Sequence, residues 1–277
     1  MDELCSCFVA FADILGYRDK IKECDNNYDV LVEQLKKIRE GVKHAQELLI
    51  DSIAALNGNT NFFSDSVFLI VPIHSTSPRE FDDGRVHICL PIEDLAQYQF
   101  ELSINDIFLR GCATVHYAFI DKKIAFGPGI LDVIECEEKC IYPRVCLSDD
   151  ILIILRHYCE NKWPGDDRVK KYIYSGYDGK FFINYLYTII DYIEDSCSII
   201  PDEALEYPLY QNIPDSLELI TQHRDIIQSN LEKATRPNVK EKFIWLVNYH
   251  NFFCREFFAE KEDLLIKNYS EDFFPIS

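Results

Sequence analysis

The sequence predicts an α/β (α+β) sandwich of the ferredoxin-like or palm type, followed by a helical C-terminal extension. Short apolar runs of strand length alternate with amphipathic segments of helical spacing up to about residue 148, and helical patterns dominate after it. A chain of 277 residues, 48% of them hydrophobic, is large enough to bury a sizeable core. We therefore expect a sheet domain over residues 1–150 and a helical extension packed on it over residues 151–277.

The first strand and the first helix have clear signals. Residues 5–12 form a short run rich in Phe, Val and Ala, which is typical of a buried central strand. Asp13 stands at its end, and Gly16 allows a tight turn whose backbone N–H groups can face a phosphate. Apolar residues then recur at helical spacing over residues 28–53 and predict one long amphipathic helix.

A hairpin is expected next, because the runs 61–63 and 66–71 read as two strands joined tightly, with Asp65 at the tip. The remaining elements expected in this half are helices over residues 91–102 and 130–140 and strands over residues 107–120, 124–126 and 143–147. Right-handed crossovers place the end of the first strand beside the hairpin tip. Asp13 and Asp65 are thus predicted to be neighbours.

The second half of the chain is expected to be mainly helical. Helical patterns cover residues 149–159, 216–235 and 239–258, and the last of these is rich in aromatic residues. We expect His250 to be a packed residue of this last helix rather than a ligand.

Composition limits the classes of function. The net charge of −19, from 47 acidic and 28 basic residues, argues against nucleic-acid binding through a basic face. No apolar run approaches the roughly 18 residues of a membrane span. Without a secretory leader pattern, we expect a cytoplasmic protein whose 11 cysteines are reduced. Cys5/Cys7 and Cys136/Cys140 lack a second pair at zinc-site spacing, which favours structural cysteines.

Asp13 and Asp65 are the chemical anomalies of the sequence, because an unpaired buried carboxylate is costly. Two carboxylates at neighbouring strand ends can bridge two divalent ions about 3.5–4 Å apart, an arrangement suited to phosphoryl transfer. With the main-chain carbonyl of Ile14 as a further ligand, such hard oxygen donors suit Mg²⁺ or Mn²⁺. The pattern leaves an alternative open, in which each Asp is only a cap or turn former.

Three ordered blocks carry a resemblance to a known family. They are FADILGY (11–17), FFSDSVFLIV (62–71) and RGCATVHYAFIDKKIAFGPGILDVIECEEKCIYPRV (110–145). The first two resemble the two metal-aspartate segments of class III adenylate and guanylate cyclases. The third resembles the Arg-x-Gly strand, glycine loop and helix that close the cyclase domain. Residues 1–150 are thus class III nucleotidyl cyclase-like, and most similar to the compact pyrimidine (uridylate) cyclases of the Pycsar antiphage defence system.

The resemblance implies a catalytic domain that converts UTP to 3′,5′-cyclic UMP and pyrophosphate, a second messenger in antiphage defence. Asp13, Asp65 and the Ile14 carbonyl match the ligands of two divalent ions, Mn²⁺ or Mg²⁺. Those ions lower the pKa of the ribose 3′ hydroxyl, which attacks the α-phosphate. The candidate substrate contacts are Phe11, Gly16, Tyr17, Arg18, Asn61 and Arg110.

The departures from the purine cyclases concern base recognition and the transition state. Asn61 stands where they carry a base-reading Lys, and Ile124 falls near their base-reading Asp. Leu131 and Glu135 fall on their transition-state Asn and Arg. These departures favour a pyrimidine, and they leave open a cytidylate cyclase making cyclic CMP or an inactive nucleotide-binding module. Arg110 is either a base or phosphate contact or the partner of a structural carboxylate.

The partners follow from the resemblance as well. The family implies a homodimer in which each site takes metal ligands from one chain and base contacts from the other. It also implies a separate effector protein that responds to the cyclic nucleotide. No nucleic acid and no membrane is expected as a partner.

Overall fold

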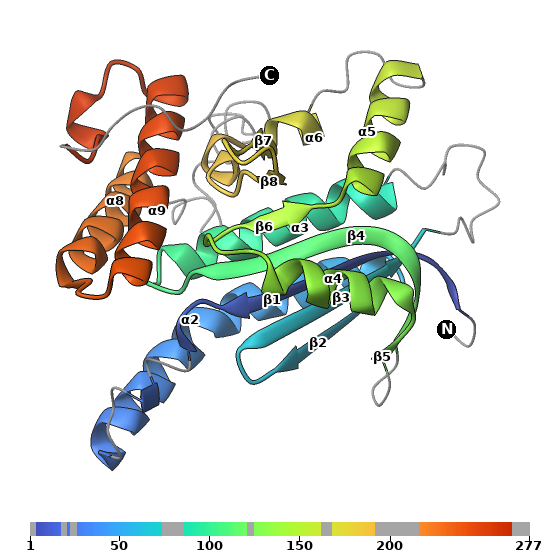
Figure 1. The fold of residues 1–277 in the computed structure, drawn as a ribbon, viewed down its shortest axis with the longest axis horizontal. Coiled ribbons are helices and arrows are strands. Elements are labelled where there is room, and N and C mark those ends of the chain that lie inside the picture. The colour runs from blue at the N-terminus through green and yellow to red at the C-terminus, as the bar shows by residue number, and fades with distance from the viewer. Residues whose placement is uncertain are drawn as a thin grey trace, which may run out of the picture. The chain divides into compact units, whose positions relative to one another are not determined.

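The computed structural model describes residues 4–17, 21–22, 27–73, 86–120, 125–161, 168–191 and 216–267 (Figure 1). The chain forms two compact units, Met1–Asn184 and Tyr185–Ser277. The first unit is built on a mixed β-sheet with helices, and the described part of the second is helical. The expected fold class, an α/β sandwich with a helical C-terminal extension, is therefore confirmed.

The sheet of the first unit has a ferredoxin-like centre. Its strands are β1 (Cys5–Ile14), β2 (Asn59–Phe63), β3 (Ser66–Pro72), β4 (Leu109–Ile120), β5 (Ala125–Phe126), β6 (Val145–Leu147), β7 (Ile173–Ser175) and β8 (Phe181–Ile183). The order is β2-β3-β1-β4-β6-β8-β7, with β5 paired to β4. The strands β4, β1, β3 and β2 are antiparallel neighbours. With helices on the connections from β1 to β2 and from β3 to β4, this is the split βαβ arrangement.

The two faces of the sheet are covered by different helices. Helices α2 (Tyr28–Ala55) and α3 (Val86–Ser103) pack together behind the sheet, and α4 (Pro128–Glu138) lies over β1 and β4 in front of it (Figure 1). Cys7 and Val9 of β1 share a core cluster with Ile130 and Val133 of α4. Because side chains alternate along a strand, Asp13 lies on this same face of the sheet.

Local signals account for the ends of several elements. The Asn27 side chain caps α2 by accepting from the backbone N–H groups of Asp29 and Val30 at 3.1 and 3.3 Å. A two-residue turn joins β2 to β3, and Ser64 takes the left-handed conformation there with φ of 56°. Asp65 is the other turn residue, so it lies at the hairpin tip as predicted.

The structure departs from the expected elements in two places. Helix α3 starts at Val86 and carries Pro91 inside it, although a helix start at residue 91 was expected because proline is tolerated in a first turn. Ile88 and Ile92 are fully buried on either side of the proline, and this burial offsets the lost hydrogen bond. The sheet also continues beyond residue 150, since β7 and β8 follow α5 (Asp149–Asn161) and α6 (Arg168–Lys171).

The expectation that all the cysteines are reduced is wrong for one pair. A disulfide joins Cys112 of β4 to Cys136 of α4. The two residues are 24 positions apart in the sequence, and only the packing of α4 on β4 brings them together. No spacing rule for local cysteine pairs could have indicated this bond.

In its described part, the second unit contains a short helical stretch over residues 187–191, then α8 (Ser216–Lys233), α9 (Pro237–Phe257) and the short 3₁₀ helix η2 (Glu262–Leu264). Trp245, Tyr249 and Phe253 of α9 are buried at helical spacing. His250 is fully buried among them, as predicted. No helix in the described parts of the chain is long and apolar enough to cross a membrane.

Candidate active site

The backbone brings the end of β1 against the hairpin tip. In the β1–β3 register, Asp13 lies opposite Ser66, and the N–H of Ile14 donates to the carbonyl oxygen of Asp65 at 2.8 Å. Asp13 and Asp65 are therefore neighbours along the sheet, as the crossover argument predicted. Asp65 is partly exposed, because it lies in the turn rather than in a strand.

The Asp13 side chain is held by Arg110. These residues lie directly opposite each other on β1 and β4. Nε of Arg110 donates to Oδ1 of Asp13 at 3.1 Å, and Nη2 donates to Oδ2 at 3.3 Å. This fork-to-fork geometry is the strong form of an ion pair. The Asp13 side chain is only 20% exposed, so the guanidinium supplies the positive charge that a carboxylate on an apolar sheet requires.

Arg110 also binds two groups at the end of α4. Its Nη2 lies 2.6 Å from Oε1 of Glu137, and its Nη1 donates to the carbonyl oxygen of Cys140 at 3.3 Å. The Glu137 side chain is 8% exposed. Burial, together with the nearby Asp13 charge, raises the pKa of Glu137 although Arg110 opposes the shift. The hydrogen bonds and charge of Asp13, reinforced by Glu137, raise the pKa of Arg110 against the effect of its own burial.

Sequence reasoning missed Glu137, although a signal for it exists. Ile130, Val133 and Glu137 recur at helical spacing, and all three are buried on the side of α4 that faces the sheet. A glutamate on the apolar stripe of a helix requires a cationic partner. Arg110, the one charged residue of the apolar strand over residues 109–120, was the available candidate.

An aromatic pair lies next to Asp13 on the same face. Phe11 lies opposite Phe68 in the β1–β3 register, and the two rings stack with their centroids 4.4 Å apart. Asn61 of β2 lies opposite Phe68 in turn. Since residues directly opposite each other share a face of the sheet, Asn61, Phe68 and Phe11 form one row beside the Asp13 row.

The turn after β1 is open. Gly16 has φ of +74°, and a Cβ placed on it would meet no atom of the described residues within 4 Å. Tyr17 is partly exposed. Arg18 and Ile124 lie outside the described residues. The turn therefore has room for a ligand group beside its backbone.

Leu131 and Glu135, which stand at the positions of the transition-state Asn and Arg of purine cyclases, point away from Asp13. Leu131 is 62% exposed, and Glu135 is also exposed. Both belong to the outer side of α4, opposite the side of Val133 and Glu137. Neither side chain faces the Asp13 carboxylate of its own chain.

The donors fit a hard divalent ion, with one condition. Two carboxylates and the Ile14 carbonyl are the oxygen ligands that Mg²⁺ and Mn²⁺ prefer. Among the described residues, no three His, Cys, Asp or Glu side chains gather as a metal-binding group. Both oxygens of Asp13 already accept from Arg110, so an ion at Asp13 would either share these oxygens with the guanidinium or displace it from one of them.

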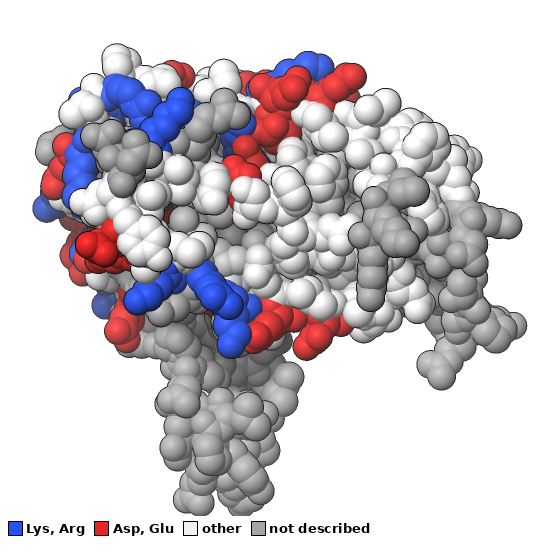
Figure 2. Space-filling view, turned by 90° about the horizontal axis from the view of Figure 1, so that it is seen from below, with Lys and Arg blue, Asp and Glu red and all other residues white. Residues whose placement is uncertain are grey.

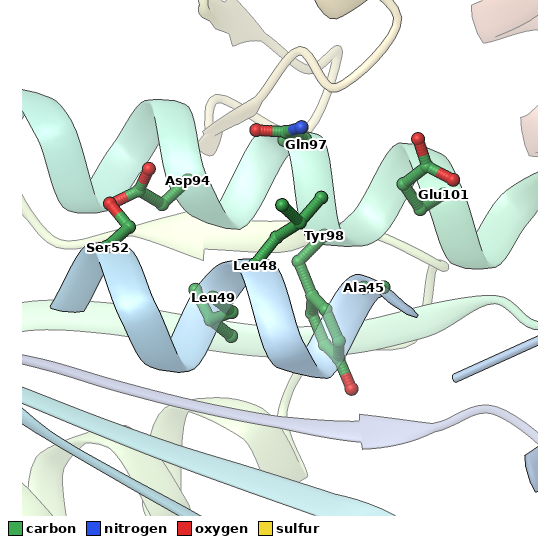
Figure 3. A pocket seen from close by; sticks show the side chains of 8 residues that line it. All are labelled: Ala45, Leu48, Leu49, Ser52, Asp94, Gln97, Tyr98 and Glu101. Atoms are coloured by element: carbon green, nitrogen blue, oxygen red, sulfur yellow. The ribbon is translucent and has the colours of Figure 1, made fainter. Parts of the chain in front are cut away.

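A separate pocket lies between α2 and α3, on the other side of the sheet. It measures about 210 Å³, and Figure 3 shows Ser52 and Asp94 pointing toward each other across it. Oγ of Ser52 donates to Oδ2 of Asp94 at 2.5 Å. Burial raises the pKa of Asp94 to about 6, although the hydrogen bond from Ser52 lowers it. Neither Asp13 nor Arg110 lines this pocket.

Comparisons with known proteins give no family assignment. No family model matches the chain, and no curated protein matches it. Among solved structures, the chain is similar to the adenylyl cyclase CyaB from P. aeruginosa, with a TM-score of 0.41 and 11% identity over 56% of this chain and 82% of that one.

Two further solved structures are a guanylyl cyclase and a bacterial light-regulated adenylyl cyclase. The TM-scores are 0.39 and 0.40, and the identities are 10% and 11%. The match to the guanylyl cyclase covers 55% of this chain and 78% of that one. The match to the light-regulated adenylyl cyclase covers 66% of this chain and 92% of that one. At such scores the likeness is too loose to transfer the role of any residue, so residue roles must come from the geometry of this chain.

Proposed function

We propose that this protein is a metal-dependent nucleotide cyclase that converts UTP to 3′,5′-cyclic UMP and pyrophosphate. The observation that carries the proposal is the placement of Asp13 beside the Asp65 turn at the centre of a split βαβ sheet. In the reaction, the ribose 3′ oxygen bonds to the α-phosphorus and pyrophosphate leaves, while the 3′ proton passes to water. Two divalent ions, Mn²⁺ or Mg²⁺, would activate that oxygen and stabilise the leaving group.

Asp13, Asp65 and the Ile14 carbonyl are the proposed metal ligands. The Arg110 guanidinium balances the charge of the Asp13 carboxylate on the sheet. With a metal ion bound at Asp13, Arg110 would keep two other acceptors, the Glu137 carboxylate and the Cys140 carbonyl. Its N–H groups that face Asp13 would then be available to a phosphate oxygen of the triphosphate.

In the proposed homodimer, the base of one site binds near the row of Asn61, Phe68 and Phe11 of the partner chain. The stacked rings of Phe11 and Phe68 offer apolar surface, and an Asn amide can donate to or accept from the edge of a pyrimidine. The same amide fits cytosine, so a cytidylate cyclase is the close alternative. Gly16, Tyr17 and Arg18 are the proposed triphosphate contacts at the open turn.

A second candidate function is a nucleotide-binding module without turnover. Leu131 and Glu135 favour it, because from the outer side of α4 neither side chain can reach a phosphate bound near Asp13 and stabilise its negative charge. A homodimer that supplies base contacts from its partner chain is the cyclase alternative. The exposed apolar side chains of Phe63 and Phe126, at 79% and 66%, support an apolar interface in this unit.

The proposed partners are a pyrimidine triphosphate, a second copy of the chain and a separate effector for the cyclic product, in an antiphage system. Nucleic acid is not among them. On the face shown in Figure 2, the described Lys and Arg side chains are interspersed with Asp and Glu, so the described residues on that face form no continuous basic surface for a phosphate backbone.

The test is incubation of the full chain with each labelled triphosphate and Mn²⁺ or Mg²⁺, followed by chromatography of the products. We expect cyclic UMP from UTP. Asp65→Ala should lose roughly 100-fold or more of this activity at an unchanged melting temperature. Asp132→Ala, which removes an exposed carboxylate of α4, is the matched control and should keep it. Binding without product would favour the inactive module, and neither binding nor product would refute both functions.

The shared dimeric site has its own test. Asp13→Ala and Asn61→Ala chains are each expected to be inactive, and mixing them should restore part of the activity if one chain supplies metal ligands and the other base contacts. If no mixture regains activity, the shared site is wrong even though the cyclase itself could stand.

A further inference from the structure

Four cysteines meet where α4 lies against β4 and β6. Cys112 and Cys146 lie directly opposite each other on the parallel strands β4 and β6. Cys136 lies on α4, and Cys140 follows the end of that helix. Cys112, Cys140 and Cys146 are each 2% exposed and form one buried cluster, against which the partly buried Cys136 packs. The cluster thus joins two strands to the end of the helix that holds Arg110.

The four sulfurs are arranged as two strand-to-helix pairs. Cys112 and Cys136 are joined by the disulfide. Cys140 and Cys146 are thiols, and Sγ of Cys140 donates a hydrogen bond to Sγ of Cys146 at 3.3 Å. The second pair therefore also connects a strand to the region of α4, but through a hydrogen bond instead of a covalent bond.

The thiols of the second pair are electrostatically unequal. The hydrogen bond from Cys140 lowers the pKa of the Cys146 thiol below its ordinary value, against burial and with help from the charges of Arg144 and Lys180. The same hydrogen bond, followed by burial, raises the pKa of Cys140. Cys146 is thus suited to react as the thiolate, and Cys140 to supply the thiol that resolves the product.

We propose that Cys140 and Cys146 form a peroxide-sensitive dithiol that closes to a second disulfide between α4 and β6. The Cys146 thiolate attacks one oxygen of hydrogen peroxide, which breaks the O–O bond, releases hydroxide and leaves a sulfenic acid. The sulfur of Cys140 then attacks Sγ of Cys146, and its proton leaves with the sulfenic hydroxyl group as water. In total, two thiols and one peroxide give one disulfide and two waters.

The second disulfide has a structural consequence near Asp13. Glu137 and Cys140 supply two of the groups that bind Arg110, and both lie on the segment that the new bond would tie to β6. Oxidation therefore fixes the segment that holds Arg110 in place. This modification site goes beyond the proposed cyclase function and does not depend on it.

A second close cysteine pair provides an internal control. Sγ of Cys5 and Sγ of Cys7 lie 3.5 Å apart in β1, and both residues are buried. Burial, followed by the interaction with Cys5, raises the pKa of the Cys7 thiol, so Cys7 is poorly suited to react as a thiolate. If proximity alone sufficed, Cys5 and Cys7 would react as readily as Cys140 and Cys146.

The experiment is a titration of the full chain with hydrogen peroxide. Catalase ends the reaction, N-ethylmaleimide blocks the remaining thiols, and peptide mapping by mass spectrometry identifies the disulfides. We expect the loss of two maleimide adducts, at Cys140 and Cys146, together with a peptide that links these residues, while Cys5 and Cys7 stay alkylated. The Cys112–Cys136 link should be present before and after.

Three results would overturn the proposal. The first is that Cys140 and Cys146 stay fully alkylated at a peroxide dose that oxidises free glutathione in the same tube. The second is a new link between other partners, such as Cys112 and Cys146. The third is that the Cys146→Ser variant loses as many maleimide adducts on peroxide treatment as the chain without substitutions. The Cys5→Ser variant is the matched control and should lose two, like the chain without substitutions. The mapping of the unmodified chain decides the first two even if a variant fails to fold.

Discussion

Acid should destabilise the second unit through two buried histidines. Nε2 of His250 lies 3.0 Å from the carbonyl oxygen of Leu264, which can only accept, so this nitrogen carries the proton. Nδ1 of His250 must then accept from Nδ1 of His223 at 3.0 Å. Nε2 of His223 in turn accepts from the hydroxyl of Tyr185 at 3.0 Å. With both rings neutral, every ring nitrogen of this hydrogen-bonded series has a partner.

The size of the effect follows from the burial of the rings. Both histidines are 0% exposed, and burial lowers the pKa of His250 to about 4 and that of His223 well below its ordinary value. Arg224 and Asp225 act on His250 in opposite directions. The unfolded chain, with an ordinary histidine pKa of 6.5, binds protons that the folded unit does not. Stability is therefore complete above about pH 6.5 and falls by roughly 3 kcal/mol toward pH 4 for His250 alone.

The assay is urea unfolding followed by the fluorescence of Trp245, in a Trp163→Phe background that leaves Trp245 as the only tryptophan. The free energy of unfolding should drop by roughly 3 kcal/mol or more between pH 7 and pH 4. His157→Gln, which replaces an exposed histidine, should keep the full pH dependence. His250→Gln should be less stable at pH 7 and lose much of the dependence. A free energy of unfolding that does not change between pH 7 and pH 4 would refute the neutral-pair reasoning.

Three further predictions concern the first unit. Gly111→Ala should lower stability by about 3 kcal/mol or more, because its Cβ would lie 2.4 Å from the carbonyl oxygen of Phe11, and an unchanged melting temperature would contradict this. Arg110→Met should tighten Mn²⁺ binding at Asp13 by up to about fivefold in calorimetry, because it removes a partly exposed ion pair that competes with the metal ion for the carboxylate. Weaker binding would contradict this and would mean that Arg110 supports metal binding. Asp94→Asn should stabilise the unit by about 1–2 kcal/mol in urea unfolding at pH 8 and much less at pH 4, because the penalty on the ionised form develops between the ordinary pKa of 3.8 and the raised pKa of about 6 and is complete above it.

The central part of the fold could be predicted because its signals are local and strong. The apolar run of β1, the long periodicity of α2 and the tight turn at Asp65 each specify an element, and the crossover rule then sets the strand order. The strands β7 and β8 could not be found in this way. Each has three residues, too few to show a period of two, and tertiary pairing with the existing sheet creates them.

The pairing of Asp13 with Arg110 in the candidate site could not be predicted from the sequence. Asp13 and Arg110 were each recognised as a charge in an apolar strand, and each had a structural and a functional interpretation. The β1–β4 register places them opposite each other, so each is the partner that the other requires. The two interpretations are then compatible, because a guanidinium that balances the charge of a carboxylate on an apolar sheet leaves the carboxylate oxygens able to bind a metal ion as well. If the pair is purely structural, Arg110→Met should weaken the fold and leave Mn²⁺ binding unchanged. If Arg110 instead competes with a metal ion for the Asp13 carboxylate, the same substitution should make Mn²⁺ bind more tightly.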